Sequence, residues 1–177
     1  MHALARRIRE GAARRAAPLR LALSAAAAVT AAGTADATDA DAAGFKLTNE
    51  EQSFVQAVNA TRARYSLPAV RVAVTLTRAA RAHSIDMIRR RYFAHGDFRG
   101  RLLRFGVTTG RVGEDLGWSI DDEAAIQRVV AMWLASPKHR YVLLLPAFRR
   151  LGVGVAEGPL KDQPDSIVVT ADFQGGG

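Results

Sequence analysis

Two histidines and one glutamate in the second half of the chain are of the residue types that could carry chemistry. His95 precedes a glycine, and Glu114 lies between a glycine and Asp115. His139 follows Ser136 by three residues. Imidazole nitrogens and carboxylate oxygens bind zinc and similar divalent cations, and a carboxylate can also move a proton. If the fold brings these residues together, they form a cleft that can hold a metal or transfer a proton, but chain spacing alone leaves that open.

Each of these residues also has an interpretation without function. A lone histidine or glutamate in a loop is commonly a solvated surface residue. Ser136 and His139 would share a helix face, which suits a serine nucleophile, but helix capping accounts for Ser136 and no aspartate is evidently placed to orient the imidazole. His83 lies on the apolar stripe of an expected helix, so we interpret it as a core histidine.

Helix signals come first along the body of the chain. Thr48 and Glu51 form a capping-box pattern, which predicts a helix ending near Tyr65. Apolar residues at helical spacing predict a second helix over about 75–91. Six glycines interrupt residues 92–117, so we expect mostly loop there.

Two further helices and then two strands are expected in the last third of the chain. A third helix is expected over about 122–135, and a short fourth helix is expected to begin with Ser136 as its N-cap. Residues 151–156 alternate apolar side chains with glycine or alanine, which predicts a strand with one nearly bare face. A second strand is expected over 167–173. Helices followed by strands indicate the α+β class rather than a doubly wound sheet.

Composition limits the classes of partner. The 177-residue chain has a formal net charge of +8, but residues 1–37 contain six of its arginines and only two acids. The rest is only weakly basic, so we expect no nucleic-acid partner, because phosphate binding needs a concentrated basic stripe. The one dense run, at 89–91, is interpreted as a solvated helix end. The absence of cysteine excludes disulfides and thiol catalysis.

The first forty residues have the pattern of a targeting segment. Arginines are followed by an apolar, alanine-rich stretch and an A-x-A triplet at 35–37. We therefore predict a signal peptide over 1–37 and a flexible lead-in over 38–46, with a mature form that is periplasmic or extracellular and has no transmembrane span. The apolar stretch is shorter than the ~20 residues that cross a bilayer. The alternative is a disordered tail or a wrong start codon.

Several motifs together resemble the bacterial branch of the CAP superfamily, which includes cysteine-rich secretory, antigen-five and plant pathogenesis-related proteins. The segment 77–95, ending in Tyr-Phe-Ala-His, is similar to one family motif, and Gly-Glu-Asp-Leu at 113–116 is similar to the Gly-Glu-Asn motif. Residues 133–140 and 148–155 are similar to the W-x-x-S-P-x-H-R and G-V-G-V signatures. The resemblance covers about residues 47–174 and implies one CAP domain, an α–β–α sandwich with an antiparallel sheet and a large surface cleft.

The resemblance also implies which residues line the cleft. His95, Glu114 and His139 match three of the four cleft residues of the eukaryotic members. The fourth, a second glutamate, would fall near Ser136 and is absent. Asp115 stands where the family usually has asparagine, which replaces an amide with a second carboxylate.

These residues lead to two functional expectations and a weaker third. The first is an exported binding module for a lipid, a peptide or a glycan fragment, with zinc or another divalent cation at His95 and His139. Glu114 would be a third ligand or a hydrogen-bond partner. The alternative is a metal-assisted hydrolase, peptidase-like or esterase-like, in which Glu114 activates water. The third is a surface adhesin that binds anions through the arginine run. The expected cleft residues are His95, Glu114, Asp115, Ser136 and His139, and the sequence carries no signal for an oligomeric state.

Overall fold

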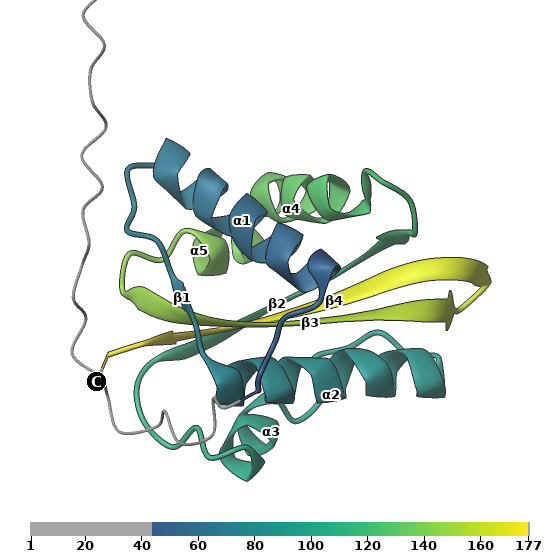
Figure 1. Cartoon of the computed structure of the whole chain (residues 1–177), viewed down its shortest axis with the longest axis horizontal. Coiled ribbons are helices and arrows are strands. Elements are labelled where there is room, and N and C mark those ends of the chain that lie inside the picture. The colour runs from purple at the N-terminus through teal and green to yellow at the C-terminus, as the bar shows by residue number, and fades with distance from the viewer. Residues whose placement is uncertain (1–43, 177) are drawn as a thin grey trace, which may run out of the picture. The chain divides into compact units, whose positions relative to one another are not determined.

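The computed structural model describes residues 44–176, which form one sheet with helices on both faces (Figure 1). The predicted signal peptide and most of the lead-in lie outside the described residues. The predicted α+β class and α–β–α sandwich are confirmed. No helix in the described part is both long enough and apolar enough to cross a bilayer.

The sheet has four strands in the order β1-β3-β4-β2. Their bounds are Arg71–Val72 for β1, Val112–Ile120 for β2, Phe148–Leu160 for β3 and Gln163–Gly175 for β4. Strand β1 runs parallel to β3, and the other two pairs are antiparallel. Strand β2 therefore lies at an edge of this sheet, next to β4.

The helices form two layers (Figure 1). One face of the sheet is covered by α1 (Asn49–Arg64), α4 (Ala125–Ala135) and α5 (Pro137–Leu143). The other is covered by α2 (Val74–Arg90) and α3 (Phe98–Arg104). Helix α1 begins at the predicted capping box, because Thr48 Oγ1 accepts from the Glu51 amide at 3.2 Å and Glu51 Oε2 accepts from the Thr48 amide at 2.9 Å.

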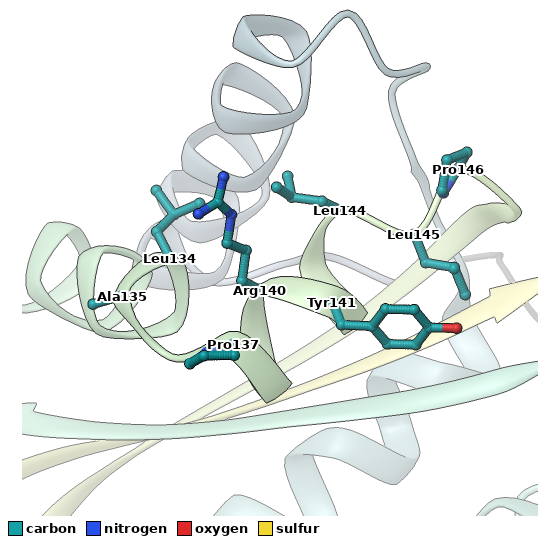
Figure 2. Close-up of a pocket in the computed structure, with 8 residues that line it drawn as sticks. All are labelled: Leu134, Ala135, Pro137, Arg140, Tyr141, Leu144, Leu145 and Pro146. Atoms are coloured by element: carbon teal, nitrogen blue, oxygen red, sulfur yellow. The ribbon is translucent and has the colours of Figure 1, made fainter.

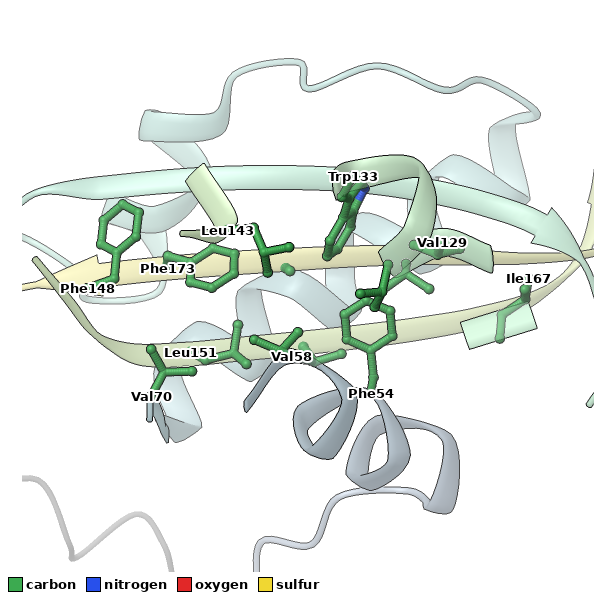
Figure 3. Packing of buried hydrophobic residues seen from close by; sticks show 14 of the residues in the cluster. Phe54, Val58, Val70, Val129, Trp133, Leu143, Phe148, Leu151, Ile167 and Phe173 are labelled. Carbon is green, nitrogen blue, oxygen red and sulfur yellow. The ribbon is translucent and has the colours of Figure 1, made fainter. Parts of the chain in front are cut away.

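The main hydrophobic core lies between the sheet and the α1, α4 and α5 layer (Figure 3). Phe54 of α1 meets Trp133 of α4 edge to face, with ring centroids 5.2 Å apart. Phe148 and Phe173 stack at 5.4 Å on neighbouring strands. This core fixes α4 and α5 against β2, the strand that carries Glu114.

The opposite face of β3 is nearly bare, as the alternation in its sequence predicted. A Cβ on Gly152 would lie 2.1 Å from the carbonyl carbon of Leu76, and one on Gly154 would lie 2.2 Å from the carbonyl carbon of Ala80. The backbone of α2 therefore lies directly on this strand, and no side chain fits between them.

The expectation that residues 92–117 are mostly loop is wrong. This segment contains α3 and more than half of β2. Its glycines at 113 and 117 serve close packing: a Cβ on Gly113 would lie 2.8 Å from the Phe148 ring, and one on Gly117 would lie 2.3 Å from a Val129 methyl. Helix α4 also begins later than expected, because Asp122 accepts from the Ala124 amide at 2.8 Å in a turn before the helix.

Candidate functional site

His95 and Glu114 meet, as the sequence predicted they could. Glu114 lies opposite Asp172 in the β2–β4 ladder, on the face covered by α2 and α3. Its Oε1 lies 2.7 Å from Nδ1 of His95, which is in the loop between α2 and α3. The His95 side chain is 54% exposed and that of Glu114 is 1% exposed. A buried carboxyl group thus holds one ring nitrogen while the rest of the imidazole faces outward.

Two further residues complete the buried side of this contact. Arg101 of α3 donates from Nη2 to Glu114 Oε2 and from Nη1 to the His95 carbonyl at 3.3 Å. Arg101 Nη2 also lies 3.7 Å from Asp172 Oδ1. Sequence reasoning did not assign either residue to the site. The sequence does contain one signal for Asp172, because it is the only acid in the apolar strand segment 167–173.

The buried acids of this region hold their protons more tightly than exposed acids do. Burial raises the pKa of Glu114 to about 7, although the charge of Arg101 acts in the opposite direction. Burial, followed by the charge of Glu114, raises the pKa of Asp172 well above its ordinary value. The same two causes raise the pKa of Asp115 to about 8. Near neutral pH the site therefore holds acid groups that can still donate a proton.

His139 approaches from the other layer, on α5. Its pKa is lowered by burial, then by the charges of His95 and Lys138. The pKa of His95 is lowered by burial and by Arg101. Both imidazoles are therefore neutral near pH 7, the form in which histidine binds a metal.

The remaining predicted cleft residues, Asp115 and Ser136, make no side-chain hydrogen bond to His95 or Glu114 in the described part of the chain. Asp115 is fully buried, and neither of its carboxyl oxygens has a hydrogen-bond partner. Ser136 occupies the N-cap position of α5 with extended backbone, as expected, but its side chain makes no capping hydrogen bond. Capping therefore does not fully account for Ser136. His83, by contrast, is a buried core residue as predicted, with Nε2 3.0 Å from the Ala94 carbonyl oxygen.

Glu114 is arranged as a hydrogen-bond partner of His95. Both of its oxygens are engaged, one by His95 and one by Arg101. Over residues 44–176 no three histidine or acidic side chains are grouped so that they could hold a metal ion. The described residues therefore provide no set of three metal ligands.

Two cavities open on the described part of the chain, and the second shares Arg101 with this set of residues. One, of about 420 Å³, is lined by α4, α5 and the segment after α5, including Leu134, Arg140, Tyr141 and Leu144 (Figure 2). Tyr141 of this group lies on the side of α5 opposite His139. The second, of about 640 Å³, lies over α2 and α3 and borders the His95 loop through Gly96 and Arg101.

Comparison with known proteins gives consistent matches over this domain. The family model described as CAP, the cysteine-rich secretory protein family, matches residues 55–173. Protein YkwD of Bacillus subtilis (strain 168) is 31% identical over 112 residues, which cover 60% of this chain and 42% of YkwD. Membrane protein YlbC of the same organism is 30% identical over 114 residues, or 61% of this chain and 32% of YlbC. The matched region is therefore less than half the length of either relative.

Solved structures share the fold. An extracellular protein containing a SCP domain from Bacillus anthracis str. Ames has a TM-score of 0.58 at 26% identity, over 73% of this chain and 44% of that one. An outer surface protein from Borrelia burgdorferi has a TM-score of 0.60 at 20% identity, over 73% of this chain and 96% of that one. The family model covers well over half of the chain, so this protein belongs to the cysteine-rich secretory protein (CAP) family.

Proposed function

We propose that this CAP domain is an exported binding module that holds its ligand beside His95 and His139, with a divalent cation such as zinc in the site. The observation that carries the proposal is the 2.7 Å contact between His95 Nδ1 and Glu114 Oε1. A carboxylate that holds one nitrogen of an imidazole fixes the ring and its tautomer, which is how metal-binding histidines are commonly supported. In this arrangement Nε2 of His95 is the nitrogen left for a metal.

Two neutral histidines would suit a cation that keeps open coordination positions. Both histidines are neutral near pH 7, and Glu114 holds His95 through a hydrogen bond at Nδ1. With two protein ligands, a zinc ion would keep positions for a ligand and would polarise a carbonyl or phosphoryl oxygen on it. A lipid headgroup, a peptide or a glycan fragment could supply such an oxygen.

Export is supported by the relatives and by the N-terminal pattern. Two proteins of the same fold are described as extracellular and as an outer surface protein. The arginine-rich start, the alanine-rich stretch and the A-x-A triplet of this chain agree with that location.

Zinc titration of the chelator-treated protein by calorimetry tests the proposal. We expect binding by the wild type and a loss of at least about tenfold in the His95→Ala, His139→Ala double variant, because both imidazole ligands are gone. His83→Gln is the control for the loss of a histidine, since His83 is buried and its Nε2 already lies 3.0 Å from the Ala94 carbonyl oxygen. Equal zinc affinity in the wild type and the double variant would overturn the metal site.

One observation favours a second candidate, a hydrolase. A glutamate with a pKa of about 7 suits general acid–base catalysis near neutral pH. Because the Glu114 side chain is only 1% exposed, its proton would reach a substrate through His95. Turnover of peptide or ester substrates that is lost in Glu114→Gln would support this candidate. If the wild type shows no turnover, or if Glu114→Gln retains it, the hydrolase is rejected and the binding module stands as the proposed function.

A further inference from the structure

Two consecutive acids of β2 point to opposite faces of the sheet. Side chains alternate along a strand, so Glu114 and Asp115 cannot share a face. Glu114 faces the α2 and α3 layer, where it bonds His95. Asp115 therefore faces the α1, α4 and α5 layer, which carries His139.

The neighbours of Asp115 place it under the junction between α4 and α5. On the same face, a Cβ on Gly113 would lie 3.1 Å from a methyl of Val142 in α5. A Cβ on Gly117 would lie 3.2 Å from Nε1 of Trp133 in α4. Asp115 is midway between the two glycines, so its carboxyl group faces the chain between Trp133 and Val142.

His139 lies in that stretch and on the matching face of α5. It precedes Val142 by three residues, so both side chains project from the same side of the helix. Val142 contacts β2 at Gly113, which directs His139 toward the same strand.

Both groups lack a partner in the described conformation. Asp115 is 0% exposed with neither oxygen bonded, and Nδ1 of His139 is also buried and unbonded. Buried polar groups without hydrogen bonds are costly and rare. A carboxyl group and an imidazole nitrogen can share one proton, so each supplies what the other lacks.

We propose that Asp115 is the carboxyl partner of His139, through a hydrogen bond to Nδ1 that mirrors the one between Glu114 and His95. Closing this bond requires the two side chains to turn toward each other beneath the α4–α5 junction. Adjacent residues of one edge strand would hold the two imidazoles, and the strand would fix their separation.

This inference extends the proposed function, because it concerns a positioning residue for His139, but its test needs no metal. The ring nitrogens of His95 and His139 are followed by ¹H–¹⁵N NMR at neutral pH in chelator-treated protein. In Asp115→Leu we expect the His139 nitrogen signals to shift and those of His95 to stay. In Glu114→Leu, which removes the oxygen that His95 Nδ1 bonds, we expect the reverse. Asp115→Asn retains an oxygen that can accept from Nδ1, so it should keep the His139 tautomer.

Unchanged His139 signals in a folded Asp115→Leu variant would overturn the proposal, and Asp115 would then be an unpaired buried acid. If Asp115→Leu does not fold, the wild type decides. A hydrogen bond at Nδ1 holds His139 in one tautomer, whereas signals averaged over two tautomers would refute the bond. Zinc binding does not enter this measurement, so a failed zinc titration and a failed Asp115–His139 pair remain separate results.

Discussion

The two faces of the sheet are built in different ways. The face toward α1, α4 and α5 packs large side chains, including Phe54, Trp133 and Phe148, into one continuous core (Figure 3). The face toward α2 packs backbone against backbone at Gly152 and Gly154. Buried polar groups gather there as well, among them Glu114, Arg101, Asp172, Ser84 and Thr170.

The two faces therefore differ in what stabilises them. Apolar packing contributes in proportion to the area removed from water. The polar face depends instead on each buried group having a partner, because one that is left unpaired is costly. The exposed end of that polar network is His95, so this face carries the His95 part of the proposed site.

Trp133→Ala should have the largest effect on this comparison. Trp133 is buried against Phe54 and donates from Nε1 to the Leu116 carbonyl at 2.8 Å. We expect a loss of about 4 kcal/mol in the free energy of unfolding, since the ring leaves a cavity in the core. Trp118→Ala, on the half-buried edge of the other face, should cost about half as much. Equal losses in urea unfolding would show that the two faces do not differ in this way.

Gly154→Ala should have the next largest effect. The added Cβ would meet the carbonyl carbon of Ala80 at 2.2 Å, and backbone cannot turn aside as a flexible side chain can. We expect a loss of about 3 kcal/mol in the free energy of unfolding by overpacking. Gly176→Ala is the control, because no atom lies within 4 Å of its added Cβ. A Gly154→Ala variant as stable as the control would contradict the close approach of α2.

The glycines also explain why strand β2 was not predicted from the sequence. The capping box at Thr48 and the apolar stripe of α2 are local signals, and both helices were predicted to within a residue or two. Gly113 and Gly117 were interpreted as loop residues because glycine is typical of turns. In the structure they lie inside β2, where α4 and α5 leave no room for a side chain. That constraint is tertiary and has no local signature.

The candidate site shows a similar division. The residue types and the family resemblance indicated His95, Glu114 and His139, and the contact between the first two is present. Arg101 was one of many arginines, and only the packing of α3 shows that it bonds Glu114. The opposite directions of Glu114 and Asp115 follow from strand geometry, which became usable only once this segment proved to be β2.

The polar face should also make stability depend on pH through His83. Burial lowers the pKa of folded His83 from 6.5 to about 4, so the unfolded chain takes up this proton first. Its contribution to stability is complete above pH 6.5 and is lost as the pH falls toward 4, by about 3 kcal/mol in all. His83→Gln should remove that part of the pH dependence. Parallel curves of unfolding free energy against pH for both proteins would contradict the burial of a neutral imidazole.

Ser84→Ala should have the smallest effect and tests the polar face most directly. Ser84 Oγ lies 2.9 Å from both the Gly154 carbonyl oxygen and Thr170 Oγ1. Its loss leaves both groups buried without this partner, and we expect a cost of about 1 kcal/mol in thermal or urea unfolding. In Thr170→Val, Ser84 can still bond Gly154. The double variant should therefore cost less than the sum of the two single variants, because the bond between the hydroxyls can be lost only once. Strictly additive losses would mean that these two hydroxyls do not act as a pair and that each is stabilised by other contacts.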